Sequence, residues 1–309
     1  MKFENFLFVM IGSGEHFFER AERFPYWKDV PTHRIIGFQV DSDTSHLEDE
    51  DRWVRASDLV YRTLVSSPSD PRLKLVFVVE DNNQEFAAAV HVWITHLMTS
   101  LIQAIRWNIQ FAVGAMENLS DLIMSVSSLI AVCGPSGSGK STLVEGVLLK
   151  PLQTRALISC TTRKKRPGEV DGQHYHFLTD EEFDSQLDDM TQTATYGGCR
   201  YGSRKVDVVN IIADGVTPVA ILSREGIIQF KNQMSCFSIL VTAQKPLCEK
   251  RMLRRGDSHE SIRKRLATWS EEVMFDPMFD LYFCPAEDLE GDIDAMISSF
   301  EDFGAATGG

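Results

Sequence analysis

GPSGSGKS, residues 134–141, matches the phosphate-binding pattern G-x-x-x-x-G-K-[S/T] at each of its defined positions. The apolar run Leu129–Cys133 precedes it as a buried strand would, and Thr142–Leu149 continues as a helix. A glycine-rich turn between a strand and a helix directs backbone N–H groups at phosphate oxygens, and the helix N-terminus adds partial positive charge. The stretch therefore predicts a nucleoside triphosphate site on a parallel α/β sheet.

The pattern assigns a task to each polar group of this loop. Lys140 is expected to reach the β- and γ-phosphates of ATP, and the Ser141 hydroxyl to hold the accompanying Mg²⁺. The alternative is a glycine-rich turn that binds no ligand, which the intact strand–loop–helix order disfavours. The predicted ATP-binding residues are Gly134, Ser136, Gly137, Ser138, Gly139, Lys140, Ser141 and Thr142.

A basic cluster follows the next predicted strand, Ala156–Ser159. The segment TTRKKRPGE, residues 161–169, holds four cations in a chain with 44 acidic and 31 basic residues and a formal net charge of −13. The acidic balance argues against general nucleic-acid binding, so one specific anion is the expected ligand. Arg163 and Arg166 can converge on one phosphate, since the planar guanidinium suits that contact. A nuclear-localisation signal is the alternative for the cluster, and a solvated face is the default for Lys164 and Lys165.

The sequence from here on resembles the guanylate kinase family. Residues 159–183, SCTTRKKRPGEVDGQHYHFLTDEEF, resemble the GMP-binding segment of that family, and Tyr201-Gly-Ser203 resembles its YG[ST] element. RMLRRG (251–256) and SIRKRL (261–266) resemble its arginine-bearing lid and the following helix. The resemblance covers roughly residues 127–300.

The resemblance implies a P-loop nucleoside-monophosphate kinase domain at 127–303, with an acceptor-binding insertion at about 163–216 and a lid at about 247–266. Such a domain would transfer the γ-phosphoryl group of ATP to a GMP-like nucleotide with Mg²⁺, and closure would exclude water. The implied catalytic residues are Lys140, Arg163, Arg255 and Arg265. The implied acceptor-binding residues are Ser159, Arg163, Arg166, Glu169, Tyr175, Gln192, Tyr201, Ser203 and Ser223.

The chain departs from the family where the base is read. Gln192 stands in place of a carboxylate that reads guanine, and a glutamine amide offers one donor and one acceptor instead of two acceptors. Ile221 and Ser223 replace two aspartates, and Cys284 lies where an asparagine is expected near the adenine. The acceptor is therefore GMP, dGMP or a related monophosphate with a pyrimidine or modified base. Glu225, or water alone, would have to compensate for the aspartates at Mg²⁺.

Residues 1–120 predict a smaller α/β domain of unassigned type that precedes the kinase domain. Strands are expected at 6–11, 34–40 and 73–79, and helices at 15–24, 51–65 and 86–109. Gly12, Gly14 and Asp41 resemble only part of a dinucleotide-binding fingerprint, so a tight turn and a solvated acidic loop are the favoured interpretation.

The helix at 86–109 carries one apolar stripe and one polar face. A membrane span would be apolar all round, so this helix is expected to pack on a core, on the kinase domain, or on a second copy in a homodimer. The chain has six cysteines with neither a CxxC pair nor zinc-ligand spacing, which favours reduced thiols in the cytoplasm.

Two other functions remain open at this point. Some guanylate-kinase-like domains bind phosphorylated peptides without catalysis, but these typically have a degraded phosphate loop, and the loop here is complete. The C-terminal domain could also act as a nucleotide-sensing switch for the N-terminal domain. ATP binding that depends on Lys140 would discriminate against the non-catalytic binding module.

Overall fold

The computed structural model describes residues 3–12, 27–39, 50–66, 73–79, 84–105, 110–145, 153–166 and 168–284. The described residues form two compact units. The first comprises the described residues up to Val126 together with Ala213–Gly215, and the second comprises the described residues of Ser127–Ile212 and those from Val216 to Cys284.

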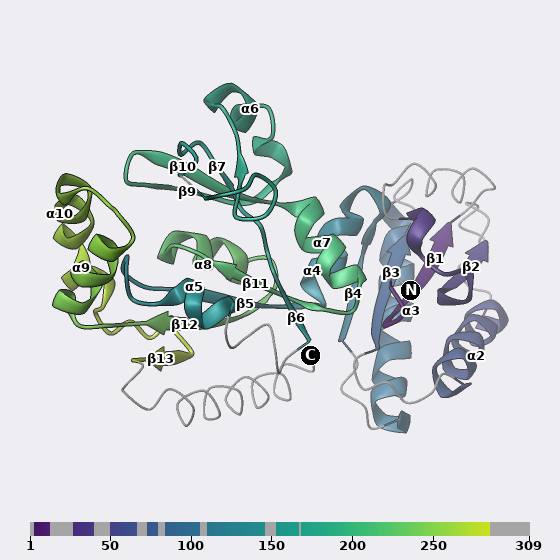
Figure 1. Cartoon of the computed structure of the whole chain (residues 1–309). Helices are drawn as coiled ribbons and strands as arrows, with labels where there is room; N and C mark the ends of the chain where they lie inside the picture. Colours follow the sequence, from purple (N-terminus) through teal and green to yellow (C-terminus); the bar gives the residue numbers. More distant parts are fainter. Residues whose placement is uncertain are drawn as a thin grey trace. The chain divides into compact units, whose positions relative to one another are not determined.

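The first unit is built on a parallel sheet (Figure 1). Its strands are β1 (Phe6–Gly12), β2 (Ile35–Gln39), β3 (Lys74–Val79) and β4 (Gln110–Ala115), in the order β2-β1-β3-β4. Each residue of β1 and of β3 is buried, as expected for central strands that are covered on both faces. Two short 3-10 helices, Trp27–Asp29 and Thr32–Arg34, precede β2. The predicted helix at 15–24 lies outside the described residues.

Two helices cover one face of this sheet. Helix α2 (Glu50–Ser66) and helix α3 (Gln84–Ile105) pack their apolar residues on alternate positions of β1 and β3. The stripe of α3, which includes Trp93 and Leu97, is thus buried within its own unit. The homodimer predicted through this stripe would consequently need another face of the helix. Among the described helices, none is both long and apolar enough to cross a membrane.

The end of the first unit contains elements that the sequence analysis did not predict. Strand β4 follows α3, and a 3-10 helix (Met116–Asn118) and helix α4 (Leu119–Ser125) follow β4 in the chain. Leu119, Leu122, Ile123 and Met124 of α4 are buried, so this segment packs as part of a core.

The second unit contains a five-stranded parallel sheet. Its strands are β5 (Ser128–Cys133), β6 (Thr154–Ala156), β11 (Thr217–Ile221), β12 (Ser235–Val241) and β13 (Leu281–Phe283), in the order β13-β12-β5-β11-β6. Helices α5 (Lys140–Leu143) and α8 (Arg224–Lys231) follow β5 and β11. Because β5 is central, the loop after it opens at the carboxyl edge, where ligands of such sheets bind. This confirms the α/β fold class.

A smaller mixed sheet belongs to the same unit. Its strands are β7 (Cys160–Thr161), β8 (His176–Phe177), β9 (Met190–Tyr196) and β10 (Cys199–Arg204), in the order β8-β7-β10-β9. Strands β7 and β8 are parallel, whereas β10 is antiparallel to both β7 and β9. Helix α6 (Asp180–Asp184), a 3-10 helix (Leu187–Asp189) and helix α7 (Lys205–Ala213) complete this segment.

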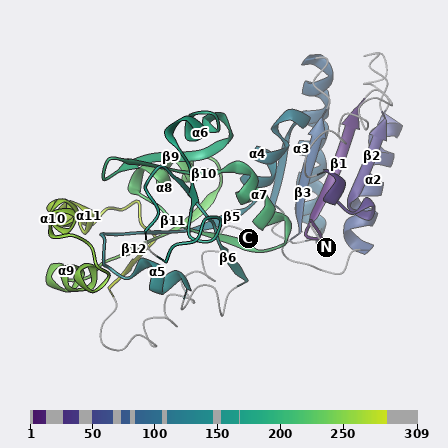
Figure 2. The same cartoon turned by 45° about the horizontal axis from the view of Figure 1, so that its top comes forward.

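Three helices between β12 and β13 form a separate small core. Helices α9 (Lys245–Arg254), α10 (His259–Ala267) and α11 (Trp269–Glu272) enclose Cys248, Met252, Ile262 and Leu266. Figures 1 and 2 show α9 and α10 side by side at one end of the five-stranded sheet. They occupy the residues for which the sequence predicted a lid.

Candidate functional site

The loop between β5 and α5 has the backbone that its glycines predict. Gly134, Gly137 and Gly139 have φ values of 139°, 84° and 110°, a region that other residues rarely adopt. A Cβ at Gly134 would lie 2.0 Å from the carbonyl oxygen of Val241, and one at Gly137 would lie 2.6 Å from that of Cys248. The loop therefore needs glycine both for its conformation and for its packing on β12 and α9.

Lys140 and Arg251 hold the carbonyl groups of this loop. Lys140 Nζ donates hydrogen bonds to the carbonyls of Gly134 (2.6 Å) and Pro135 (2.8 Å). Burial lowers the pKa of the Lys140 ammonium below its usual value. Arg251 Nη1 donates to the carbonyls of Gly137 (3.1 Å) and Ser138 (3.0 Å). Within the loop, the backbone N–H of Ser138 donates to the carbonyl of Pro135 (3.2 Å).

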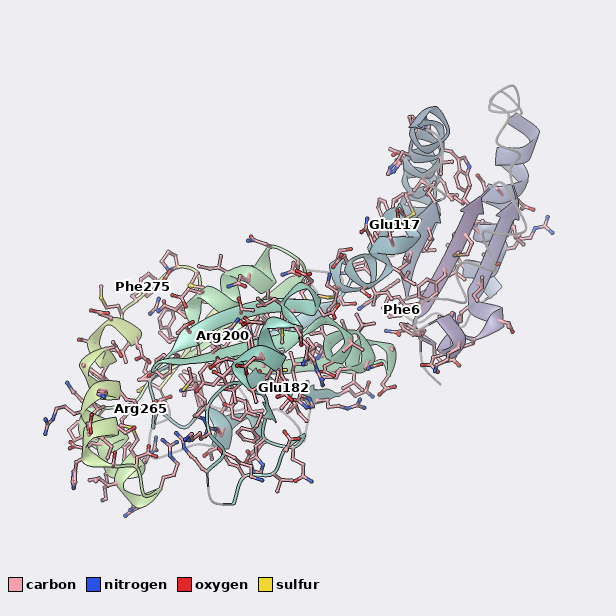
Figure 3. The ribbon with its side chains drawn as sticks, turned by 90° about the horizontal axis from the view of Figure 1, so that it is seen from above. Phe6, Glu117, Glu182, Arg200, Arg265 and Phe275 are labelled. Atoms are coloured by element: carbon pink, nitrogen blue, oxygen red, sulfur yellow. The ribbon has the colours of Figure 1, made fainter. Side chains whose placement is uncertain are left out.

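Ser136 connects the loop to α10. Arg265 Nη1 donates a hydrogen bond to Ser136 Oγ (2.9 Å), and Figure 3 shows Arg265 on this helix. The Arg265 guanidinium also lies 5.9 Å from the ring centre of Tyr196, at the end of β9. The predicted catalytic Arg265 is thus at the phosphate-binding loop. Arg255 is instead about half exposed and pairs with Asp257.

The basic cluster is organised around one carboxylate, that of Glu169. Arg163 makes a bidentate ion pair with Glu169, with Nη1–Oε2 and Nη2–Oε1 distances of 3.0 and 2.8 Å. Glu169 Oε2 also accepts from the backbone N–H of Arg166 (2.8 Å). The Arg163 guanidinium lies 5.3 Å from the ring centre of Tyr175, and this ring contacts that of Tyr201 with centres 6.1 Å apart. Glu169 therefore orients the arginines.

The predicted arginines influence one another. The pKa of Arg166 is below its usual value because of burial and because the charges of Arg163, Arg255 and Arg265 disfavour its cation. Lys164 and Lys165, by contrast, are exposed. Glu169 and Asp257 pair with Arg163 and Arg255 and offset part of this positive charge, and the remainder would attract an anion. The arrangement is suited to phosphate groups on both sides of a transfer reaction.

Three residues predicted to bind the acceptor, Ser159, Gln192 and Ser203, are polar, uncharged and buried. Gln192 and Ser203 face each other across β9 and β10, and Gln192 Nε2 donates a hydrogen bond to Ser203 Oγ (3.1 Å). Gln192 Oε1 lies close to Gly226 in the first turn of α8, because a Cβ atom added to Gly226 would be only 3.0 Å from this oxygen. These residues thus present an amide and a hydroxyl where a carboxylate would accept two donors.

Ser223 has the contacts of a helix cap. Its hydroxyl accepts a hydrogen bond from the backbone N–H of Gly226 (3.2 Å) at the start of α8. Its Oγ also lies 3.4 Å from Glu225 Oε2. The acceptor-binding role of Ser223 remains a prediction from the resemblance.

The donor groups suit a Mg²⁺ ion that arrives with ATP. Ser141 is exposed in the first turn of α5, as is Thr142. Within the described ranges, no group of three His, Cys, Asp or Glu side chains could hold a metal. Mg²⁺ in kinase sites takes few protein ligands and completes its shell with phosphate oxygens and water. Ser141 is therefore a suitable ligand for a nucleotide-bound ion.

Sequence reasoning missed three residues at this site: Arg251, Tyr196 and Glu272. Arg251 opens the quoted RMLRRG segment, so the motif held the signal for it. Tyr196 and Glu272 lie in no recognisable motif, and their side chains come within 3.5 Å of each other only through the fold.

Comparison with known proteins finds relatives of the second unit. A family model described as guanylate kinase matches residues 126–301, and no family model matches the N-terminal region. A guanylate kinase of Gloeobacter violaceus is 37% identical over 161 residues, covering 50% of this chain and 78% of the relative. One of Helicobacter pylori is 34% identical over 176 residues, covering 55% and 85%. A crystal structure of guanylate kinase from Anaplasma phagocytophilum aligns with a TM-score of 0.42 at 21% identity, covering 57% and 85%.

Proposed function

The chain belongs to the guanylate kinase family, and from that premise we propose that GMP or dGMP, or a monophosphate with a related base, is its phosphoryl acceptor. As a member of this family it is an ATP-dependent nucleoside-monophosphate phosphotransferase. The observation that carries the proposal is the set of three arginines (Arg163, Arg255 and Arg265) around Arg166, together with an intact phosphate-binding loop.

Each side of the site has a distinct task in this proposal. The loop at 134–139 and Lys140 bind the triphosphate of ATP, and Arg163 and Arg166 hold the acceptor phosphate. Arg265 then neutralises the charge that spreads over the transferring group. Ser141 would hold Mg²⁺, which supplies further charge neutralisation when it is bound with ATP. Phosphoryl transfer needs alignment and charge neutralisation more than covalent help, and these are the tasks that the proposal gives to the residues above.

Gln192 bears on the choice of acceptor base. Guanine presents two N–H donors on one edge, and a carboxylate can accept both. Gln192 offers one oxygen, and its N–H group is already directed at Ser203 Oγ (3.1 Å). GMP should therefore bind with one charge-assisted hydrogen bond fewer, a difference of about 1.5–3 kcal/mol. A base whose edge carries both a donor and an acceptor would lose less binding free energy than guanine does.

The test is a coupled ATP-consumption assay over a panel of monophosphates: GMP, dGMP, AMP, CMP, UMP, dTMP and 5-hydroxymethylpyrimidine deoxynucleotides. The variant Gln192→Glu should raise kcat/KM for GMP by about tenfold or more and lower it for pyrimidine monophosphates, because the new carboxylate can accept both N–H donors of guanine. Lys140→Ala serves as the inactive control. No turnover of any monophosphate, with ATP still bound, would contradict the proposal and favour a sensing or binding role.

The cysteines support a cytoplasmic location for this activity. All six are free thiols, and Cys133, Cys160, Cys236 and Cys248 are buried. Free thiols persist in reducing compartments, whereas secreted domains usually pair them. Titration of six thiols in the unfolded protein without reductant would support this location, and a lower number would count against it.

A further inference from the structure

Strand β9 is the last strand of the mixed sheet, in the order β8-β7-β10-β9, and it pairs with β10 on one side. In an antiparallel pair, every second residue directs its backbone groups away from the partner strand. The N–H and C=O groups of Thr193 and the C=O group of Thr191 point this way, because they bind side chains from the region of α8. These outward contacts therefore determine how β9 is held on its second side.

Two glutamines make the outward contacts of β9. Gln229 lies in α8, which runs beside β9 in Figures 1 and 2. Its Oε1 accepts a hydrogen bond from the N–H of Thr193 (3.0 Å), and its Nε2 donates to the C=O of the same residue (2.9 Å). Gln233, four residues further on, donates from Nε2 to the C=O of Thr191 (2.7 Å) and to the C=O of Gln229 (2.9 Å). A glutamine amide has the donor and the acceptor of a peptide group, so Gln229 pairs with β9 as a neighbouring strand would.

Gln192 lies between these two anchored residues of β9, and its side chain is buried. Its Nε2 donates to Ser203 Oγ (3.1 Å), and its Oε1 is close to Gly226 in the first turn of α8. The backbone on both sides of Gln192 and its side-chain oxygen are thus all placed relative to one helix. Any shift of β9 along α8 would carry the Gln192 amide with it.

We propose that Gln229 and Gln233 are positioning residues for recognition of the acceptor base: they hold β9 against α8 and so fix where the amide of Gln192 meets the base. Proteins usually cover the edge of a sheet, but a cover alone could bind β9 at any point along its length. The hydrogen bonds here flank the residue that is predicted to read the base. The inference rests on the proposed function, because it requires a nucleoside monophosphate at Gln192.

The experiment measures the acceptor preference of Gln229→Met in the full chain. Methionine is similar in length to glutamine, but it cannot donate to the C=O of Thr193 and is only a weak acceptor for its N–H. Initial rates of ADP formation over the panel of monophosphates named above give kcat/KM for each acceptor and the KM for ATP. The matched control is Gln186→Met, because Gln186 Nε2 donates to the C=O of Glu182 (3.1 Å), four residues away in its own segment. Thermal unfolding shows whether each variant is folded.

Gln229→Met should reduce the ratio of kcat/KM between the best and the second-best acceptor by about tenfold, because an amide that moves rejects a mismatched base less strongly. The KM for ATP should match that of the parent, and Gln186→Met should match the parent in both quantities. Gln233→Met removes a single hydrogen bond to β9 and should reduce the ratio by a smaller factor. It replaces Gln229→Met in the comparison if that variant does not fold.

A second background separates positioning of Gln192 from general stability. In Gln192→Ala, the further change Gln229→Met should leave the ratio unchanged, because no amide is left to position. The inference alone would be overturned by an equal reduction of the ratio in both backgrounds. It would also be overturned if Gln229→Met lowered kcat/KM by the same factor for every acceptor, as a general loss of stability would. No turnover of any monophosphate by the parent would overturn the proposed function together with the inference.

Discussion

Glu169→Gln tests whether the basic cluster depends on one carboxylate. Glu169 accepts two hydrogen bonds from Arg163 and one from the backbone of Arg166, at 2.8–3.0 Å. The side chains of Arg163 and Glu169 are only 11% and 15% exposed, so solvent screens the pair weakly. Each charge-assisted bond contributes about 1.5–3 kcal/mol, and glutamine keeps one acceptor while turning an N–H group toward the guanidinium. The free energy of unfolding should fall by about 2–4 kcal/mol.

The same variant should also impair the acceptor side of catalysis. Arg163 would no longer be held in place, and a misplacement of about 1 Å in a positioning group costs roughly 10²-fold in rate. We expect kcat/KM for the acceptor monophosphate to fall by about that factor, while the KM for ATP changes little. Steady-state kinetics with each substrate varied in turn measures this difference.

The pH dependence gives an independent check on the ion pair. Burial alone would raise the pKa of Glu169, but the hydrogen bonds from Arg163 and Arg166 and their charges bring it below its usual value. The native state then binds fewer protons than the unfolded state, so the stabilisation is present above the unfolded pKa of about 4.3 and is lost as pH falls further. The stability difference between parent and variant should therefore narrow below about pH 4.

Urea unfolding provides the measurement, and Glu260→Gln provides the control. Glu260 pairs with Lys264 at 2.9 Å, but both side chains are more than three-quarters exposed. An exposed ion pair of this kind adds little to the free energy of unfolding, so the control should unfold at the same urea concentration as the parent. If Glu169→Gln were as stable as this control and kept its acceptor kcat/KM, the assignment of Glu169 as the anchor of the basic cluster would be wrong.

Three further predictions concern other parts of the unit. Gly134→Ala should abolish ATP binding in a titration, whereas Gly172→Ala, which also has positive φ but open space around it, should cost only about 1–2 kcal/mol in stability. Burial and the nearby Arg204 lower the pKa of His176 in the folded protein, so the free energy of unfolding should decrease as pH drops below about 6.5. When the free energy of unfolding is measured against pH for His176→Gln, this decrease should be absent. Arg265→Ala should reduce kcat by about 10²–10³-fold in steady-state assays, with a smaller effect on ATP affinity.

Local patterns were enough to predict the conformation of the glycine-rich loop and the proximity of Arg163, Arg166 and Glu169. The residues of the loop are contiguous, and Arg163, Arg166 and Glu169 lie within seven positions, so spacing alone constrains their geometry. The α/β fold also follows from apolar runs such as Leu129–Cys133, because a strand that is buried on both faces must be apolar throughout.

Strand β4 and the contacts of Glu272 could not be predicted in the same way. Gln110–Ala115 directly follows the predicted long helix and contains few β-branched residues, so periodicity could not separate it from that helix. The contact between Tyr196 and Glu272 joins residues 76 positions apart, and Arg224 reaches across 52 positions to Asp276. Such pairs are determined by tertiary packing.

The most direct test of the central claim is the stoichiometry of product formation by the full chain with MgATP and GMP, resolved by ion-exchange chromatography. One nucleoside diphosphate should form from the acceptor for each ADP released, and Lys140→Ala should form neither product. ADP release without a second diphosphate, or equal turnover in Lys140→Ala, would contradict phosphoryl transfer at this site.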